Sequence, residues 1–330
     1  MLAHLRSIGA ATLLGLTLFA SWQTDAAAQN FPDGQVTIIV PFAAGGGVDT
    51  IARLVADDLR AQWSVPVLVE NMPGGSGMIG AQALTRAEPD GRTLMLATAG
   101  ELAVNTTLLS GSLSYDVAKD FAPVALAARI PNVFVVKGDS SFANVGDFVA
   151  AAKQNPDTMT YGSSGVGNPQ HLTGALLGYR AGVELVHVPY KGSSQQVLDT
   201  MGGNIDATFA SAAAVLANVQ DGSLKALAVT SKERMGVLPD VPAVGETAGL
   251  EGFDLVNWFG FVTKAGTPPE TVAILHESIE KALQTEATKT RLQAIGAEFV
   301  PMTTAEFTGF IGSETEKFAG IIKDASITAE

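Results

Sequence analysis

The chain has 330 residues, enough for two domains of ordinary size that each bury a core. Its 33 acidic residues against 20 Lys and Arg give a net charge of -13, which repels nucleic-acid phosphates and anionic lipids. No cysteine occurs, which excludes disulfides, thiolate metal sites and a cysteine nucleophile. We therefore expect no nucleic-acid partner.

The first 28 residues have the features of a secretory signal peptide. His4 and Arg6 form a basic start, residues 8–20 are almost continuously apolar, and residues 26–28 are small, as a cleavage site requires. An apolar run of this length is too short for a membrane anchor, because a spanning helix needs about 20 residues. We expect export from the cytoplasm with cleavage near Ala28.

Strand and helix patterns alternate after this segment. Amphipathic helices are expected from Asp49 onward and over 304–322. Such alternation predicts parallel sheets covered by helices on both faces, which is a doubly wound α/β fold. Short β-branched and apolar runs predict buried strands at 36–40, 65–69, 94–97, 133–136, 183–188, 205–209, 224–229 and 259–262.

Three loops rich in glycine and small residues each follow a strand and precede a helix. At the carboxyl edge of a parallel sheet, such loops meet helix N-termini, whose unpaired amides favour an anion. We therefore expect the three loops to line one ligand site. The site residues are Phe42, Ala44, Gly45 and Gly46 in the first loop, Ala99, Gly100 and Asn105 in the second, and Ser163, Ser164, Gly167, Asn168 and the following His171 in the third.

Residues 75–80 (GSGMIG) match the dinucleotide-binding pattern G-x-G-x-x-G. The acidic residue that such a site needs is missing, because the position about 20 residues further on lies beyond the next strand. P-loop and serine hydrolase signatures do not occur in the sequence. His171, His187 and His276 form no i, i+4 pair of metal ligands. We expect no cofactor, no metal ion and no catalytic residue.

Eight short motifs follow one another along the chain. They are VPF at 40–42 with glycines 45–47 and Asp49, VENMPG at 69–74, PDG at 89–91, YD at 115–116 with KDF at 119–121, SSG at 163–165, HVPYKG at 187–192, LAVT at 227–230 and LPDVP at 238–242. In this order they are typical of one family, and the chain resembles its members, the Bug-type receptors, which are extracytoplasmic solute-binding components of tripartite tricarboxylate transport. The resemblance covers nearly the whole chain after residue 28.

The resemblance implies a type II-like periplasmic binding protein, with two α/β lobes joined by two crossover segments and closing on a ligand like a hinge. Family members hold a small carboxylate through backbone amides and ordered water, at positions that correspond here to 42–47 in one lobe and 163–168 in the other. Chain breakers at Pro131 and 249–252 guide the division of the chain. Lobe one is expected at 29–130 and 254–330, and lobe two at 131–253.

One departure from the family bears on the ligand. Relatives that bind amino acids tend to place an Asp directly after the strand-end Phe, where it pairs with an ammonium group. Here Phe209 is followed by Ala210 and Ser211, which we expect to face the ligand. Burying an ammonium group without a counter-charge is costly. We therefore expect a non-amino mono- or dicarboxylate, aromatic acids included.

The resemblance implies a monomeric periplasmic receptor that captures a small organic carboxylate and delivers it to the membrane components of a tripartite transporter, with no chemistry performed. Two alternatives stay open at this point. A sensory receptor would present the same ligand to a membrane signalling protein. A secreted hydrolase would use Ser163 and Ser164 of the third loop.

Overall fold

The computed structural model describes residues 31–329, so the predicted signal peptide lies outside the described residues. The strands are β1 (Val36–Val40), β2 (Val67–Asn71), β3 (Thr93–Thr98), β4 (Phe121–Lys137), β5 (Thr160–Ser163), β6 (Val186–Pro189), β7 (Ala207–Ser211), β8 (Leu224–Val229) and β9 (Val256–Lys264). The helices are α1 (Gly47–Trp63), α2 (Met78–Thr85), α3 (Asn105–Leu108), α4 (Val117–Asp120), α5 (Val145–Gln154), α6 (Pro169–Ala181), α7 (Ser193–Gly202), α8 (Ala212–Gln220), α9 (Pro269–Gln284), α10 (Glu286–Ala294) and α11 (Thr304–Asp324). Short helical turns are η2 (Gly75–Gly77), η3 (Gly100–Val104) and η4 (Val244–Glu246).

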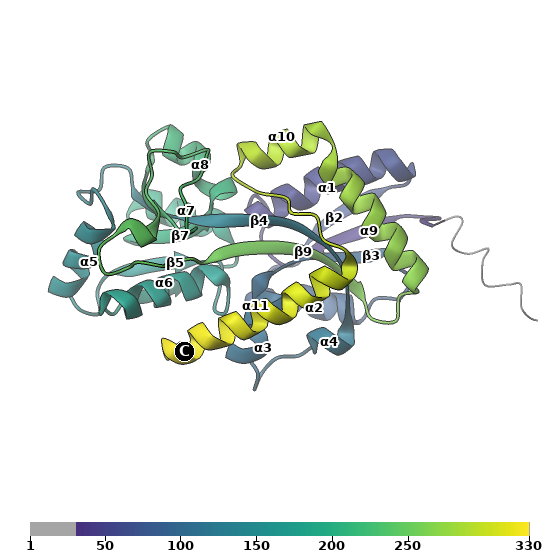
Figure 1. Cartoon of the computed structure of the whole chain (residues 1–330), viewed down its shortest axis with the longest axis horizontal. Helices are drawn as coiled ribbons and strands as arrows, with labels where there is room; N and C mark the ends of the chain where they lie inside the picture. The colour runs from purple at the N-terminus through teal and green to yellow at the C-terminus, as the bar shows by residue number, and fades with distance from the viewer. Residues whose placement is uncertain (1–30, 330) are drawn as a thin grey trace, which may run out of the picture.

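The strands form one hydrogen-bonded path in the order β2-β1-β3-β9-β4-β7-β5-β6, with β8 also paired to β4. We call the part built on β1, β2 and β3 lobe one, and the part built on β5, β6 and β7 lobe two. The strands named for each lobe are parallel, as predicted. The prediction is wrong for β4 and β9, which are antiparallel to their neighbours and run side by side across the middle (Figure 1). The chain passes between the lobes through the extended strands β4 and β9, and not through a crossover helix.

The longest strand, β4, belongs to both lobes. Its residues 121–131 pair with β9, and from Asn132 onward it pairs with β7 and β8. The sequence predicts only 133–136 as strand, because Pro123 and Pro131 interrupt the apolar run. A register shift follows Pro123, and Pro131 lies where β4 exchanges one partner for the other, so the sheet accommodates both prolines.

Apolar residues are buried on both faces of the sheet. Consecutive strand residues point to opposite faces, so Ile38 and Val135 belong to one core cluster, and Ile39 and Phe134 to the other. Helices α1, α9 and α10 cover the first face, and α2, α6 and α11 cover the second (Figure 1). The prediction that β1 is buried on both faces is therefore confirmed.

Two strands predicted to be buried, β2 and β6, are the edges of the sheet. Their apolar residues Leu68 and Val186 are 48% and 39% exposed. An edge strand has a neighbour on one side only, so the structure covers it less completely than a central strand such as β1.

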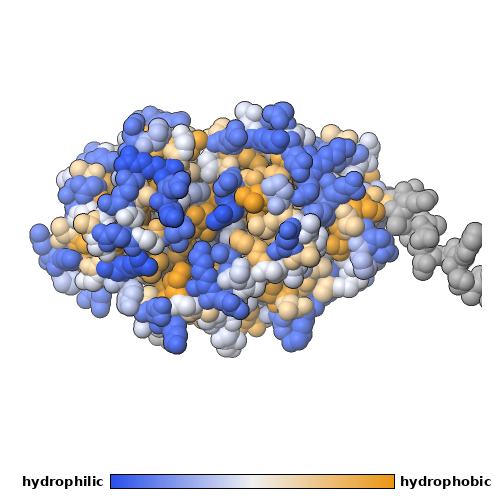
Figure 2. All heavy atoms as spheres, viewed as in Figure 1, coloured by the Kyte–Doolittle hydropathy of each residue, from blue (hydrophilic) through white to orange (hydrophobic). Residues whose placement is uncertain are grey.

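Hydrophilic side chains are spread over both lobes on the face shown in Figure 2, and hydrophobic ones lie mainly in the recesses between them. Among residues 31–329, no helix is long and apolar enough to cross a bilayer. Only three acidic residues of this range are buried, namely Asp49, Glu101 and Glu314. The negative charge is therefore carried mainly at the surface.

Candidate functional site

The carboxyl ends of the parallel strands of both lobes meet around a cavity of about 230 Å³. Lobe one contributes the loops after β1 and β2, and lobe two contributes the loops after β5 and β6. Two of these four loops are among those that the sequence predicts. The lining residues are Pro41, Phe42, Gly74, Gly75, Ser76, Gly77, Ser164, Gly165, Val166, Pro189, Tyr190 and Lys191.

The loop after β2 is the one that carries the dinucleotide pattern, and sequence reasoning missed it as part of the site. Ser76 and the glycines at 74, 75 and 77 all have positive φ angles. The chain turns tightly there and brings main-chain atoms to the cavity wall. The signal in the sequence is the same as for the predicted loops: glycines between a strand and a helix.

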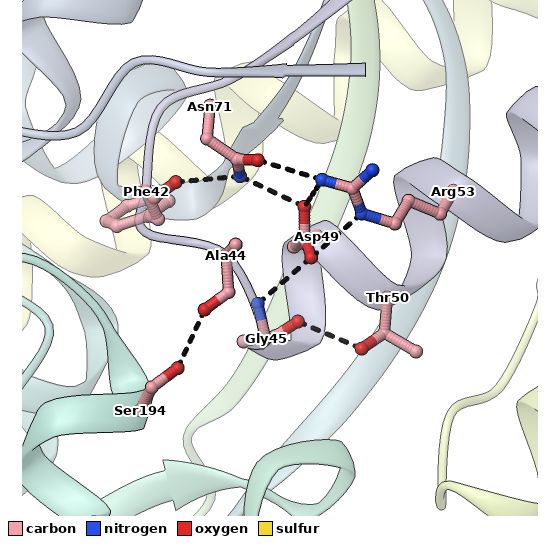
Figure 3. Close-up of polar contacts among 9 residues, drawn as sticks. Phe42, Ala44, Gly45, Asp49, Thr50, Arg53, Asn71 and Ser194 are labelled. Atoms are coloured by element: carbon pink, nitrogen blue, oxygen red, sulfur yellow. Dashed lines mark hydrogen bonds and ion pairs between the residues drawn. The ribbon is translucent and has the colours of Figure 1, made fainter. Parts of the chain in front are cut away.

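The two lobes touch around this cavity. The amide of Ala43 donates a hydrogen bond to the carbonyl oxygen of Lys191 at 3.2 Å. The Ser194 hydroxyl donates to the carbonyl oxygen of Ala44 at 2.8 Å (Figure 3). The structure is therefore that of a closed cleft, and the first loop of lobe one is bonded directly to lobe two.

Asp49, at the start of α1, organises the first loop (Figure 3). Its carboxylate accepts hydrogen bonds from the Gly45 amide at 2.9 Å, the Arg53 Nε at 3.1 Å and the Asn71 Nδ2 at 3.0 Å. Asn71 also donates to the carbonyl oxygen of Phe42 at 3.0 Å. Burial opposes the charge on Asp49, but the bonds from Arg53, Gly45 and Asn71 outweigh it and lower the pKa of Asp49. The carboxylate therefore stays ionised and holds the loop in shape.

The amide of Gly45 is thus not one of the unpaired donors that the sequence predicts. The next two amides, those of Gly46 and Gly47, have no acceptor within hydrogen-bond distance in the described part of the chain. Gly47 lies against lobe two, since a Cβ atom there would be 2.5 Å from the Ser211 hydroxyl oxygen. Close contact between the lobes explains why no side chain fits at this position.

Polar groups of the third loop are bonded mainly to one another. The amide and hydroxyl of Ser164 both donate to Gln170 Oε1 at 2.9 Å, and the hydroxyl lies 3.1 Å from that of Ser193. Asn168 caps α6, because its Oδ1 accepts the Gln170 amide at 3.0 Å. Of the predicted residues in this loop, Ser164 lines the cavity, and Asn168 acts as a helix cap.

Two histidines stack beneath this loop. The ring of His187 lies between those of Tyr161 and His171, with centroid distances of 5.0 and 4.2 Å. Burial lowers the pKa of His171 to about 4, and burial together with the charge of His171 lowers the pKa of His187 to about 3. Both rings are therefore neutral near pH 7. His171 Nδ1 accepts the Gly167 amide at 3.3 Å, so this predicted residue shapes the loop.

Ser163 is bonded to His187, with 2.6 Å between the hydroxyl oxygen and Nε2. A serine nucleophile needs an oriented base and access to substrate. Ser163 is fully buried, and within residues 31–329 no carboxylate oxygen is hydrogen-bonded to His187. The pair is therefore a structural contact and gives no support to the hydrolase alternative.

The second loop contains a buried acid that sequence reasoning did not select. Glu101 Oε2 accepts the amide and hydroxyl of Thr98 at 2.7 and 2.8 Å, whereas Oε1 has no hydrogen-bond partner in the described chain. Burial outweighs the bonds from Thr98 and raises the pKa of Glu101 to about 7. The sequence signal for a buried acid is the single charged residue within the apolar segment LATAGELAV at 96–104.

Asn105 and Gly100 form the contact between the second loop and lobe two. Asn105 Nδ2 donates to the carbonyl oxygen of Ser76 at 3.2 Å, and its Oδ1 lies against Gly167, where a Cβ atom would overlap it. Gly100 also packs against lobe two, since a Cβ atom there would be 3.3 Å from the carbonyl oxygen of Gly167. The second and third loops thus meet directly, but no residue of the second loop is among those that line the cavity.

Of the predicted site residues, only Phe42 and Ser164 are among those that line the cavity. Ala99 and Ala210 are fully buried in the two core clusters and do not line the cavity. Ala210 follows the alternation of β7, which turns its side chain into the core, whereas Ala99 lies just after β3, in helical backbone at the start of η3. Because Ala210 does not face this cavity, the absence of an acidic side chain at this position gives no argument about the ligand.

A larger hollow of about 580 Å³ lies beside β4 and β9. It shares no lining residue with the interlobe cavity, and charged side chains of both signs surround it, including Arg129, Lys232, Asp254 and Glu298. Only the smaller cavity lies among the glycine-rich loops, and we take that cavity as the candidate site.

A two-lobed α/β fold with glycine-rich loops around an interlobe cavity is typical of periplasmic binding proteins. The model of the tripartite tricarboxylate transporter family receptor matches residues 51–327, and the chain belongs to this family. Protein BugT of Bordetella pertussis is 33% identical over 298 residues, which cover 90% of this chain and 91% of BugT. The resemblance to Bug-type receptors is therefore confirmed.

Solved structures agree with this assignment. R. palustris Rpa4515 with adipate has a TM-score of 0.87 at 32% identity, covering 90% of this chain and 99% of the other. MatC from Rhodopseudomonas palustris with bound malate has a TM-score of 0.84 at 29% identity, covering 88% and 100%. Periplasmic binding protein BugD has a TM-score of 0.86 at 30% identity, covering 90% and 99%. The chain is a solute-binding receptor and not an enzyme.

Proposed function

We propose that this receptor captures a small non-amino carboxylate in the interlobe cleft and delivers it to the membrane components of a tripartite transporter. The observation that carries the proposal is the cavity of about 230 Å³ lined by loops of both lobes. Adipate and malate, the ligands of two similar structures, support a dicarboxylate.

Donors for a carboxylate come mainly from the main chain. Gly46 and Gly47 are not among the residues that line the cavity, but they belong to the same loop as Phe42, which does, and their unpaired amides lie at the N-terminus of α1, where the helix dipole favours negative charge. Lys191 is the only basic residue among those that line the cavity, and no acidic residue lines it. A carboxylate is therefore bound by amides, hydroxyls and water, with at most one cationic side chain.

We also infer where the receptor acts and how the chain is divided. Removal of residues 1–28 after export would place a monomeric receptor in the periplasm, which N-terminal sequencing of the exported protein tests. Lobe one comprises 29–130 and 254–330, and lobe two comprises 131–253. This division fits the change of pairing partner at Asn132 and the start of β9 at Val256.

Calorimetry with adipate, malate and aspartate tests the ligand class. We expect one of the two dicarboxylates to bind and aspartate not to bind. Ligand at a free concentration of 100 times its Kd adds about 2.7 kcal/mol to the free energy of unfolding, which thermal unfolding detects. Binding of aspartate alone would contradict the non-amino ligand, and no binding of any carboxylate would contradict the function. Loss of carboxylate uptake in a deletion strain tests delivery.

A matched pair of glycine variants tests the site. Gly46 has a φ angle of -84°, and the nearest atom to a Cβ there is 3.8 Å away, so Gly46→Ala introduces no strain. The added methyl group shields the amide from a ligand, and we expect weaker binding at an unchanged Tm. Gly111→Ala is the control, because nothing lies within 4 Å of a Cβ at Gly111, far from the cleft loops in the sequence. Equal binding by both variants would exclude the first loop from the site.

A further inference from the structure

Glu101 differs from the other buried acids of the described chain in having no cation beside it. Asp49 lies 2.9 Å from Arg53, and Glu314 lies 3.4 Å from Lys317. Glu101 is fully buried, and its only side-chain bonds come from Thr98. A buried carboxylate without a compensating charge is costly to keep ionised.

The unpartnered oxygen of this carboxyl group points at the cleft wall. A Cβ atom on Gly77 would overlap Glu101 Oε1, so the oxygen is in contact with Gly77. Gly77 itself lines the interlobe cavity. One glycine therefore separates the carboxyl group from the space that a ligand would occupy.

Glu101 lies in η3, and the elements packed against η3 bring few ionisable groups to it. Strand β3, helix α3 and turn η2 carry none. Helix α11 contributes one buried ionisable side chain, Glu314, which accepts a bond from Trp258 Nε1. Tyr115 donates to the carbonyl oxygen of Glu101, and burial together with the charge of Glu101 raises the pKa of Tyr115. Across the cleft, α6 carries His171, which is neutral near pH 7.

A ligand carboxylate in the cavity would place a second negative charge next to Glu101 Oε1. Two like charges that close in a site of low dielectric constant cannot both persist, and protonation of one relieves the repulsion. We propose that a carboxylate binds in this cleft together with one proton, which Glu101 takes from solvent. The inference rests on the proposed function and assigns Glu101 to the binding site of the receptor.

The proton uptake falls in the neutral pH range. The pKa of Glu101 in the free protein is raised to about 7, and a bound anion raises it further. Above pH 6.5 a ligand carboxyl group of ordinary pKa is fully ionised, and His171 and His187 are neutral. The affinity should therefore fall with rising pH above 7, at a rate that approaches tenfold per pH unit for uptake of one proton.

Calorimetry with adipate and malate between pH 6.5 and 8.5 tests the inference. In two buffers of different ionisation enthalpy, the binding enthalpy of the unaltered receptor should differ, because protons are drawn from the buffer. In Glu101→Gln the amide imitates the protonated acid, and the affinity should not change with pH. Glu314→Gln, a control at the buried acid outside the cleft, should keep the pH dependence of the unaltered receptor.

The outcomes separate the two proposals. Binding that is independent of pH and buffer in the unaltered receptor would overturn proton uptake and leave the proposed function intact. A pH dependence that survives in Glu101→Gln would assign the proton to another group and also overturn the inference. If neither dicarboxylate binds at any pH, both proposals fail together.

Discussion

Asp49 and Glu101 are both buried acids of lobe one beside the same cleft, yet their environments favour opposite protonation states. Asp49 receives bonds from an amide, an arginine and an asparagine, which hold its pKa below the ordinary value. Glu101 receives bonds only through Oε2 and has no cation, so burial raises its pKa to about 7. The donors around an acid, more than its depth, decide its charge.

This difference separates a fixed part of the cleft from a variable one. The ionised Asp49 keeps the loop of Gly45 in one conformation at every pH at which it holds its charge. Glu101 gains or loses a proton near neutral pH, and with it the negative charge next to the cavity. The first acid therefore positions the loop, and the second adjusts the electrostatic potential that a ligand meets.

The largest expected effect is on the pH dependence of stability. The pKa of Glu101 is raised from 4.5 to about 7, so its stabilising contribution is complete below pH 4.5 and is lost as the pH rises through 7. This loss amounts to about 3 kcal/mol. Urea unfolding from pH 5 to 8 should show this fall in the unaltered protein and not in Glu101→Gln.

The difference between the two unfolding curves is the informative quantity. His171 and His187 have lowered pKa values, so their contribution is lost as the pH falls below 6.5, in the opposite direction. Both proteins share that loss, and it cancels in the difference. Parallel curves for the two proteins would show that Glu101 is not the group that titrates.

Asp49→Ala tests the fixed part of the cleft. The substitution removes the shared acceptor of the Gly45 amide, Arg53 and Asn71, and we expect a loss of about 2 kcal/mol in the free energy of unfolding and weaker carboxylate binding. Asp57→Ala on the same helix is the control, because its ion pair with Arg60 is exposed and contributes about 0.5 kcal/mol. Equal losses in denaturant unfolding would contradict the organising role of Asp49.

Gly77→Ala tests the contact between the glycine loop and Glu101. Gly77 has a φ angle of +86°, and a Cβ there would overlap the Glu101 carboxyl oxygen. Gly222 has a similar φ angle of +80° with nothing within 4 Å of a Cβ, so Gly222→Ala measures the backbone strain alone. We expect Gly77→Ala to lose about 1 to 2 kcal/mol more than Gly222→Ala in thermal unfolding. Equal losses would place Glu101 away from the loop.

The smallest effect is expected for Ser194→Ala, which removes a hydrogen bond between the lobes. The lost bond to the carbonyl oxygen of Ala44 corresponds to about 0.5 to 1.5 kcal/mol, so carboxylate binding should weaken about twofold to tenfold. Ser313→Ala removes a serine bond to a carbonyl within α11 and should leave binding unchanged. Titration calorimetry on both variants measures the effect, and an unchanged affinity in Ser194→Ala would show that this bond does not stabilise the bound state.

Much of the fold follows from local pattern. The β-branched run at 36–40 is strand β1 as predicted, and 224–229 is β8, because short apolar runs between polar turns have few other ways to be buried. The pattern fails at β4, where Pro123 and Pro131 interrupt the apolar run and only the pairing with β9 and β7 makes the segment one strand. A strand that depends on partners far away in the chain has no local signature.

The candidate site is also predictable only in part from the sequence. The loops at 42–47 and 163–168 are recognised from glycines after strands, and the structure brings both to the cleft. The local sequence does not show which polar groups of these loops are free to bind a ligand. The amide of Gly45 is bonded to Asp49, and the hydroxyl of Ser164 to Gln170, as a result of helix geometry and side-chain direction.

The sequence by itself determined an α/β fold with glycine-rich loops, since strand, glycine and helix patterns are local properties, and the resemblance of its ordered motifs to one family implied a receptor. Only the tertiary structure decided the charge of its buried acids, because that charge depends on donors from other segments. Asn71 from the end of β2 keeps Asp49 ionised, whereas no cation reaches Glu101 from any described segment. The protonation state of the cleft is therefore a property of the folded chain.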